Sequence, residues 1–368
     1  MTTTPTYIMI GGFLGAGKTT TVARLAKHYM SLGKKVGIVT NDQTDDLVDT
    51  HSLRAQGFQV GEVAGSCFCC NFDALTSTVE GLGEGELPDV ILAEPVGSCT
   101  DLVATVIRPL TKVYGRPLDV APYGVILKPS HGLRILRNEA KGGFSPQAAY
   151  IFRKQLEEAD FILVNRIDQL TEAEVAELTT RLNDDFPGRP IVKISALTGE
   201  GFDGLIEFLD RRGDFGQRQM EVDYDVYAEG EAELGWLNSQ LTVESDTDLS
   251  VDDLLLGIIT RLRDAFDFAD AESAHSKAIG MGEGFYGVAN LVSNATGPEM
   301  SLVSDASVKR LDVVVNARVA IDPAELELLV RHAVSETCSE LGARFDIRSL
   351  QSFRPGRPVP THRISTAE

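Results

Sequence analysis

The sequence has little positive charge and no long apolar run. Its 34 lysines and arginines stand against 54 aspartates and glutamates, which sets the formal net charge at -20 at pH 7. This balance indicates no basic surface for nucleic acid or for an anionic membrane, and we expect neither as a partner. No apolar stretch reaches the length of about 20 residues that a membrane-spanning helix needs.

The chain also has few cysteines. There are only five in 368 residues, and three of them crowd into four consecutive positions. A disulfide framework spaces its cysteines along a short secreted chain, whereas this chain is long and 43% hydrophobic. We therefore expect a cytoplasmic globular protein, and its length predicts two domains rather than one core.

A glycine-rich segment near the start matches a phosphate-binding loop. Residues 12–19 read Gly-Phe-Leu-Gly-Ala-Gly-Lys-Thr, which fits G-x-x-x-x-G-K-[ST]. A short apolar run at 7–10 precedes the loop, and apolar residues at helical spacing follow it from 19 to 32. Strand, loop and helix in this order favour a nucleotide site over a glycine-rich turn without a nucleotide. The residues expected to bind the nucleotide here are Gly12, Gly15, Ala16, Gly17, Lys18, Thr19 and Thr20.

Acidic residues follow two further apolar runs, at 35–40 and 89–94, that read as buried strands. Asp42 comes after the first run, and Glu94 ends the second, with Gly97 three residues later. A carboxylate at this end of a strand can hold hydrated Mg²⁺ or the attacking water, and a glycine N–H can sense the γ-phosphate. The acidic residues just after Asp42 could serve the same site or only cap the next helix. We predict the catalytic residues Lys18, Asp42, Glu94 and Gly97, and the magnesium ligands Thr19, Asp42 and Glu94.

Three thiols lie close together between these two acidic elements. Cys67, Cys69 and Cys70 stand just before a helical pattern that begins at residue 72, and a turn at 69–70 would bring all three together. Thiols at a helix N-terminus have lowered pKa values and become ready metal ligands. Three sulfurs suit zinc or a similar ion, with Glu62, water or a partner's ligand in the fourth position. A redox pair and buried inert cysteines are the alternatives.

Two later segments predict which base is bound. The run at 161–164 leads into Asn165 and Asp168, which fit N-[KR]-x-D, and the run at 191–194 leads into Ser195 and Ala196. A buried aspartate in this pattern accepts from the guanine ring N–H and amine, and adenine offers no such donors. The backbone N–H groups of the second segment can meet guanine O6. Together the two segments predict GTP.

The chain resembles the CobW-like GTPases, relatives of the urease and hydrogenase nickel-insertion GTPases, over roughly residues 5–212. The segments that carry the resemblance are the phosphate loop at 12–20, Cys-Phe-Cys-Cys at 67–70, Glu-Pro-Val-Gly at 94–97 and Asn-Arg-Ile-Asp at 165–168. Two features depart from the family. Thr-Asn-Asp at 40–42 is closer to the urease accessory GTPases than to the usual Asn-Glu-Phe-Gly, and the histidine-rich tract is missing.

The resemblance implies a metal-binding GTPase that uses GTP, GDP and Mg²⁺ and delivers Zn²⁺ or Co²⁺ to a client metalloprotein. In the mechanism that we expect, the bound nucleotide changes the affinity for the metal, and the bound metal changes the affinity for the nucleotide. We also expect GTP hydrolysis to be slow until a client or the second subunit of a homodimer completes the site. One alternative is a GTPase chaperone that loads or matures a cobalamin-dependent enzyme and has structural cysteines. Another alternative is an ATP-dependent small-molecule kinase, in which the three clustered cysteines would have no role.

The predicted fold class is a doubly wound, mostly parallel α/β domain followed by a smaller α+β domain. The predicted bounds are 1–214 for the GTPase domain, 215–352 for the second domain, and 353–368 for a tail rich in proline and arginine. Within the second domain we predict helices at 251–268 and 323–338 and strands near 275–279, 285–292, 311–320 and 345–350. This order suggests a ferredoxin-like β-α-β-β-α-β domain. The tail reads as extended and is expected to be disordered.

Overall fold

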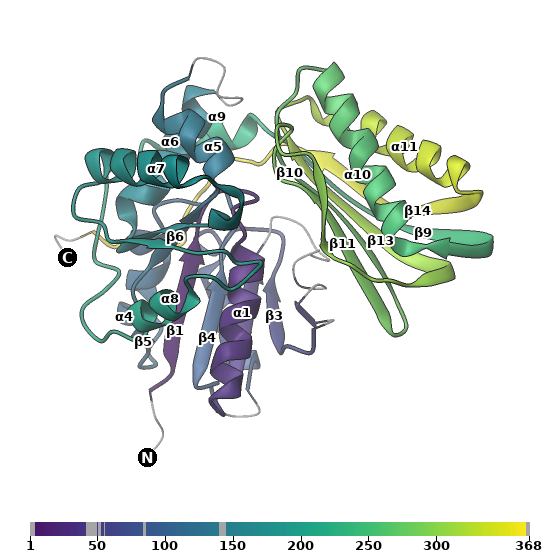
Figure 1. Ribbon diagram of the computed structural model, residues 1–368. Helices are drawn as coiled ribbons and strands as arrows, with labels where there is room; N and C mark the ends of the chain where they lie inside the picture. The colour runs from purple at the N-terminus through teal and green to yellow at the C-terminus, as the bar shows by residue number, and fades with distance from the viewer. Residues whose placement is uncertain are drawn as a thin grey trace. The chain divides into compact units, whose positions relative to one another are not determined.

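The computed structural model describes residues 4–41, 50, 53–54, 56–83, 86–139 and 145–365. The chain divides into two compact units (Figure 1). The first takes in residues 1–140, 147–227 and 357–368, and the second takes in residues 141–146 and 228–356. The end of the chain therefore belongs to the first unit.

The elements of the first unit begin with a strand and end with a helix that leads into the second unit. They are β1 (Thr6–Gly11), α1 (Lys18–Ser31), β2 (Val36–Asn41), β3 (Val60–Val63), α3 (Phe72–Gly81), β4 (Val90–Glu94), the π-helix η1 (Val103–Ile107), α4 (Arg108–Lys112), β5 (Asp119–Val120), β6 (Gly124–Leu127), α5 (Pro129–Leu136), α6 (Pro146–Glu158), β7 (Phe161–Val164), the 3-10 helix η2 (Ile167–Gln169), α7 (Glu172–Asp185), β8 (Ile191–Lys193), α8 (Phe202–Leu209) and α9 (Tyr224–Ala232). The elements of the second unit are β9 (Gly235–Ser250), α10 (Val251–Phe268), β10 (Ser273–Gly282), β11 (Phe285–Leu291), β12 (Pro298–Leu302), β13 (Ser307–Val319), α11 (Pro323–Glu340) and β14 (Ala343–Phe353).

The first unit is built on a parallel sheet with the strand order β3-β2-β4-β1-β6-β7-β8, and β5 pairs with β1. All of these neighbouring strands run parallel. The prediction of a doubly wound α/β domain is confirmed. Because parallel strands share one carboxyl edge, the carboxyl ends of β1, β2, β4, β7 and β8 lie along that edge.

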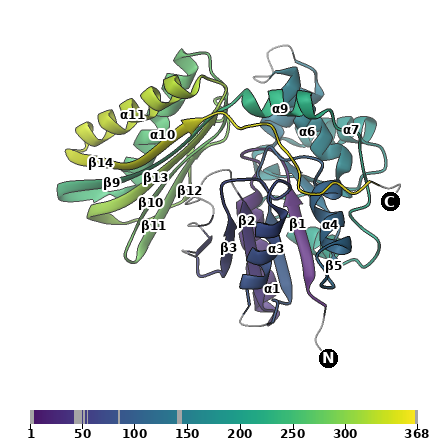
Figure 2. The same ribbon diagram turned by 180° about the vertical axis from the view of Figure 1, so that it is seen from behind.

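Helices cover both faces of this sheet. Figures 1 and 2 show α1 and α8 on one face and α3 and α4 on the other. Val22 and Leu25 of α1 pack with Phe202 and Leu205 of α8 and with Ile8 of β1 in one buried apolar cluster. Burial of each such side chain contributes about 1.5–3 kcal/mol. This packing fixes α1, and with it the phosphate loop, against the sheet.

Most strands of the first unit fall where the sequence predicts them. The runs at 7–10, 35–40, 89–94, 161–164 and 191–194 correspond to β1, β2, β4, β7 and β8. The apolar run from 118 to 127 forms two short strands, β5 and β6, and Pro122 lies between them. Proline has no N–H to give to a sheet, which explains the break. The short strand β3 is not among the predicted elements.

The second unit is a six-stranded antiparallel sheet with the order β12-β11-β10-β13-β9-β14. The strands β9, β10, β13 and β14, with α10 and α11, form the β-α-β-β-α-β order of the ferredoxin-like fold. The β11–β12 hairpin is an addition between β10 and β13. The whole of the 16-residue β9 lies in the acidic residues 221–253, for which no strand bounds are predicted.

Both helices of the second unit pack into a single core with the sheet. Leu254 and Ile258 of α10, Val330 and Val334 of α11, and Leu241 of β9 belong to one buried cluster. The helix predicted at 251–268 matches α10 residue for residue. The helix α11 begins after Asp322, whose side chain accepts from Ala324 N.

The C-terminal segment, residues 357–365, lies extended on the first unit and crosses it in Figure 2 as a yellow trace. Thr361 N donates to Cys69 O at 2.8 Å, and Ile364 N donates to Ala104 O at 2.9 Å. The expected extended form is confirmed. The expectation of disorder is wrong for these residues, because they exchange main-chain hydrogen bonds with a folded unit.

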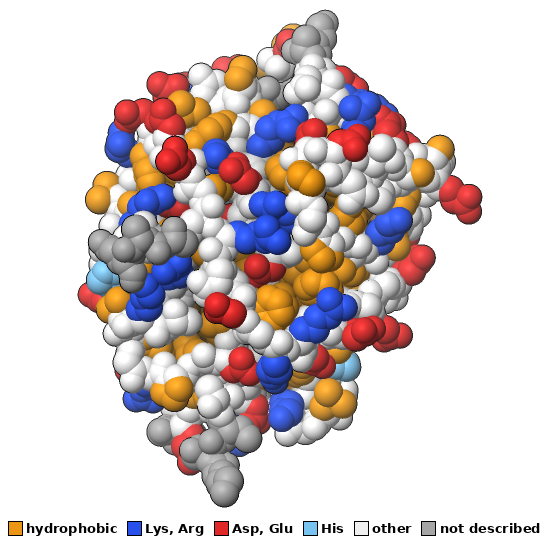
Figure 3. Space-filling model, turned by 90° about the vertical axis from the view of Figure 1, so that its left-hand side faces the viewer, with side chains coloured by type: hydrophobic (Ala, Val, Ile, Leu, Met, Phe, Trp, Pro, Cys, Tyr) orange, Lys and Arg blue, Asp and Glu red, His pale blue; other side chains and the backbone are white. Residues whose placement is uncertain are grey.

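The surface carries charges of both signs. On the face drawn in Figure 3, lysine and arginine side chains alternate with acidic and apolar ones. Among the described residues, no helix has the length and apolar character needed to cross a membrane.

Candidate functional site

The phosphate loop joins β1 to α1. Gly17 adopts φ +97°, a left-handed conformation that favours glycine, and a Cβ at this position would lie 2.3 Å from Nδ2 of Asn165. Lys18 is 8% exposed, and its Nζ donates to the carbonyl of Gly12 at 2.9 Å. The lysine is therefore held against the loop whose N–H groups would receive phosphates. Of the other predicted loop residues, Ala16 is buried, Gly15 is half-buried with φ +69°, and Thr20 is exposed on the first turn of α1.

Thr19 and Glu94 meet across the loop. The hydroxyl Oγ1 of Thr19 donates to Oε1 of Glu94 at 2.8 Å, and Glu94 is only 5% exposed. A hydroxyl and a carboxylate side by side are oxygen ligands of the kind that Mg²⁺ prefers, so this pair fits the predicted magnesium site. Asp42, the third predicted magnesium ligand, lies outside the described residues.

Gly97 packs directly on the phosphate loop. A Cβ at Gly97 would lie 2.9 Å from the backbone N of Leu14, so a side chain here would push the two loops apart. The buried amide of Gln155, on α6, donates from Nε2 to the carbonyls of Gly97 and Cys99, at 2.9 and 2.8 Å. Sequence reasoning missed Gln155, since nothing in the pattern of α6 distinguishes it from other polar residues.

Asn165 joins the loops predicted to recognise the base to the phosphate loop. Its Nδ2 donates to Ala16 O at 2.8 Å, and its Oδ1 accepts from Ala196 N at 2.9 Å. Ser195 and Ala196 are buried at the end of β8. Asp168, on η2, is exposed rather than buried, so its carboxylate is accessible to a ligand.

The three cysteines form a compact turn before α3. Cys70 N and Asn71 N both donate to Cys67 O at 3.0 Å, and Asn71 then caps α3 by accepting from Ala74 N. The three Sγ atoms lie within 4.8 Å of one another. The separations are 3.0 Å from Cys67 to each of the other two sulfurs and 3.6 Å from Cys69 to Cys70. The predicted turn is therefore present and does gather the thiols.

The three thiols differ in pKa. Hydrogen bonding with Cys69 and Cys70 holds the pKa of Cys67 well below its usual value. Hydrogen bonding with Cys67 raises the pKa of Cys69, and it raises the pKa of Cys70 to about 12. Of the lowered pKa values that the sequence predicts, only that of Cys67 is found, and its thiol is hydrogen-bonded to other thiols of the cluster. Metal binding must displace the protons that remain on these thiols.

This sulfur cluster fits a zinc ion. Zinc–sulfur bonds of about 2.3 Å place the sulfurs of a tetrahedral site about 3.8 Å apart, so the sulfurs would separate by less than about 1 Å. Glu62 lies half-buried on β3 and does not belong to the group of ligand atoms within 4.8 Å, which among the described residues contains only the three sulfurs.

Asn41 links the nucleotide edge of the sheet to the cysteine turn. It is the last residue of β2, and its Nδ2 donates to Val63 O at 2.9 Å and to Ser66 O at 2.7 Å. Its Oδ1 accepts from Phe68 N at 2.8 Å. One buried side chain thus holds the loop from β3 through the first residues of the cysteine turn. Sequence reasoning named the segment 40–42 but not this role of Asn41.

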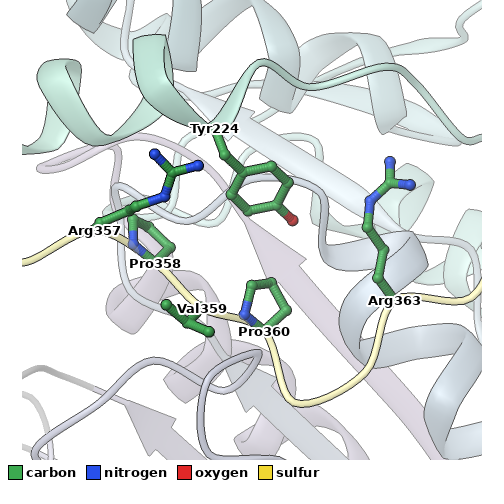
Figure 4. Close-up of a pocket in the computed structure, with 6 residues that line it drawn as sticks. All are labelled: Tyr224, Arg357, Pro358, Val359, Pro360 and Arg363. Atoms are coloured by element: carbon green, nitrogen blue, oxygen red, sulfur yellow. The ribbon is translucent and has the colours of Figure 1, made fainter.

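The C-terminal segment lies against the cysteine turn. Val359 N donates to Cys70 Sγ at 3.2 Å, and Thr361 Oγ1 donates to Cys70 O at 3.1 Å. A pocket of about 290 Å³ lies beside this segment, lined by Tyr224, Arg357, Pro358, Val359, Pro360 and Arg363. Figure 4 shows Tyr224 between the two arginines. Arg363 Nε donates to the buried carboxylate of Asp101 at 2.7 Å and anchors the segment.

The first unit of the chain is similar to known proteins. A family model described as CobW/HypB/UreG, nucleotide-binding domain, matches residues 6–193, just over half of the chain. The chain is 30% identical over 175 residues to the zinc chaperone YeiR of Escherichia coli, a match that covers 46% of this chain and 48% of YeiR. It is also 30% identical over 219 residues to the urease accessory protein UreG of Metallosphaera sedula, covering 54% of this chain and 90% of UreG.

Among solved structures, the Zn(II)-bound YjiA GTPase of E. coli is 16% identical, with a TM-score of 0.39, over 90% of this chain and 99% of that one. The chain spans about half the length of YeiR and nearly all of UreG. The family match extends from β1 to the last residue of β8, and so includes the phosphate loop, the cysteine turn and Asn165. The chain belongs to the CobW/HypB/UreG family.

Proposed function

We propose that this protein is a GTP-hydrolysing chaperone that couples its nucleotide cycle to delivery of a divalent metal, of the zinc or cobalt class, to a client protein. The observation that carries the proposal is the buried amide of Asn41, which joins the end of β2 to the cysteine turn. A rearrangement at the nucleotide edge of the sheet would act on the metal cargo through this contact.

The nucleotide site divides its tasks among a few residues. Lys18 would bind the β- and γ-phosphates, and Thr19 and Glu94 would hold Mg²⁺, which supplies charge neutralisation at the phosphates. The N–H of Gly97, which packs on Leu14, would contact the γ-phosphate, so the position of its loop would depend on whether that phosphate is present. Asp168 would select guanine, and Asn165, Ser195 and Ala196 would shape the base site.

The cargo site is the cysteine turn. Zinc is the first choice, because thiolates and a tetrahedral site suit it, and the similarity to YeiR, which is named a zinc chaperone, supports the same choice. Loss of the γ-phosphate contacts would relax the loop that follows β4 and weaken the hold on the metal. By linkage, bound metal must then change nucleotide affinity by the same factor.

The test is the zinc affinity of the protein with Mg²⁺ and a non-hydrolysable GTP analogue, compared with the affinity with GDP. A difference of about tenfold corresponds to a coupling free energy of about 1.4 kcal/mol, within the usual range for linked sites. In Lys18→Ala, the difference should vanish while the metal still binds. In the triple variant with serine at positions 67, 69 and 70, metal binding itself should vanish.

Equal zinc affinities in the two nucleotide states would contradict coupled delivery. GTP binding with no metal binding at all would favour the alternative of a GTPase chaperone for a cobalamin-dependent enzyme, with structural cysteines. Equal affinity for ATP and GTP would remove the guanine assignment and favour a kinase.

A further inference from the structure

A fourth cysteine lies against the cysteine turn, and it comes from a different part of the chain. Cys99 is 1% exposed and stands in the loop after β4, two residues beyond Gly97. Its thiol is hydrogen-bonded to the thiols of both Cys67 and Cys69. Cys99 therefore lies beside two of the three sulfurs of the cysteine turn, although among the described residues the ligand atoms within 4.8 Å of one another are those of Cys67, Cys69 and Cys70 alone.

We propose that Cys99 is the fourth protein ligand of the metal held by Cys67, Cys69 and Cys70. The metal is a divalent ion of the zinc class, and the site is a closed tetrahedron of four sulfurs. The proposal rests on the metal site of the proposed function and deepens it. Water or the carboxylate of Glu62, the ligands expected from the sequence, would have no place in this site.

The surroundings of Cys99 favour a ligand over an ordinary core cysteine. Its backbone N donates to Val96 O at 3.0 Å, and its carbonyl accepts from Gln155 Nε2 at 2.8 Å. The main chain is thus fixed on both sides of the sulfur. A ligand fixed in advance loses little conformational entropy when the metal binds. Cys338, the fifth cysteine, lies instead in the apolar core of the second unit.

The position of Cys99 gives the metal a direct link to the nucleotide. Its loop begins at Glu94, which accepts from Thr19, and passes Gly97, which packs on Leu14 of the phosphate loop. A metal bound to Cys99 restrains this loop, and a change of the loop on hydrolysis would withdraw one of four sulfurs. Loss of one sulfur converts a closed site into an open three-sulfur site, from which a client can take the ion.

The experiment is a cobalt titration of the full-length protein, wild type against Cys99→Ser. Thiolate-to-cobalt charge-transfer absorption grows with the number of bound thiolates. In Cys99→Ser we expect one ion per chain, about a quarter less charge-transfer absorption and at least about tenfold weaker binding. The matched control, Cys338→Ser, should match the wild type in both measurements. Nucleotide dependence of the affinity should shrink in Cys99→Ser and persist in Cys338→Ser.

X-ray absorption of the zinc-loaded wild type tests the same proposal without a mutation that could disturb folding. Four sulfur neighbours at about 2.3 Å are expected. Three sulfurs with one oxygen or nitrogen would overturn the role of Cys99 and leave the proposed metal function intact. Unchanged cobalt spectra and cobalt affinity in Cys99→Ser would likewise overturn the role of Cys99 and leave the proposed metal function intact. A wild-type protein that binds neither ion would instead overturn the proposed function, and this inference with it.

Discussion

Asn165 and Ala16 are joined by a buried hydrogen bond of 2.8 Å that ties the base-recognition loop to the phosphate loop. The same side chain accepts from Ala196 N, so a single amide connects three loops that follow three different strands. The nucleotide site is therefore held together before any ligand enters it.

Asn165→Ala removes both bonds and leaves two buried backbone groups without this partner. We expect the free energy of unfolding to fall by about 3 kcal/mol and the GTP affinity to fall with it, since each lost buried bond costs about 1–3 kcal/mol. Denaturant titration and binding of a fluorescent GTP analogue are the measurements. Gln169→Ala, at an exposed position on η2, is the control. An unchanged affinity would show that the amide does not organise the site.

Asp168→Asn replaces the carboxylate acceptor with an amide, which meets the guanine amine unfavourably. We expect affinity for GTP to fall by at least about 100-fold and xanthosine triphosphate to become the better ligand. Competition binding of GTP, xanthosine triphosphate and ATP measures the change. The prediction fails if the variant keeps its preference for GTP.

Glu94→Gln removes the negative charge beside Thr19 while keeping a side chain of the same shape. We expect GTP to bind still, the Mg²⁺ concentration needed for activity to rise, and turnover to fall by about 100-fold, because metal charge stabilisation is worth several kcal/mol. Phosphate release against Mg²⁺ concentration is the measurement. Glu62→Gln, on β3 and outside the sulfur cluster, is the control. Wild-type turnover in Glu94→Gln would exclude this residue from the mechanism.

Glu158 predicts an effect of pH on stability. Burial raises the pKa of this carboxyl well above its usual value, although its Oε2 accepts from Val103 N at 3.0 Å. A carboxyl with a raised folded-state pKa contributes stability that is full below its unfolded pKa and is lost as pH rises through the folded value. In Glu158→Gln this position no longer ionises, so the variant does not lose stability in this way as pH rises.

The melting temperature of Glu158→Gln should therefore rise relative to wild type as pH increases from 4 to 8. Thermal melts across this range test the sign. Glu172→Gln, at an exposed position on α7, controls for the loss of one negative charge. A difference that stays constant, or that favours the wild type at high pH, would contradict the prediction.

Removal of residues 357–368 should expose the cysteine turn. The contacts of Val359 and Thr361 with Cys70 disappear, and with them the cover over a half-buried sulfur. We expect Cys70 to react several-fold faster with a thiol reagent, since access is one of the two determinants of cysteine reactivity. Mass spectrometry assigns the modified residue, and Cys338 is the internal reference. Equal rates for Cys70 in both proteins would mean that the segment gives no protection.

The sequence by itself determined the elements whose signals are local. The α10 helix is read correctly from 251 to 268 because its apolar residues repeat at helical spacing and Ser250 supplies a cap. The phosphate loop, the cysteine turn and the segment predicted to recognise guanine are also short runs of neighbouring residues. Their spacing carries the chemistry, so no knowledge of the fold is needed to find them.

Only the tertiary structure decided which distant residues meet these motifs. Gln155 and Cys99 lie outside every recognised motif, and Asn41 lies in the segment 40–42 without a predicted role. Each contacts a loop far from it in the chain. The C-terminal segment likewise reads as a disordered tail, because its proline-rich composition has no local structure. Its order comes from the folded unit beneath it, where hydrogen bonds to Cys69 and Ala104 and the ion pair with Asp101 offset the entropy of fixing the chain.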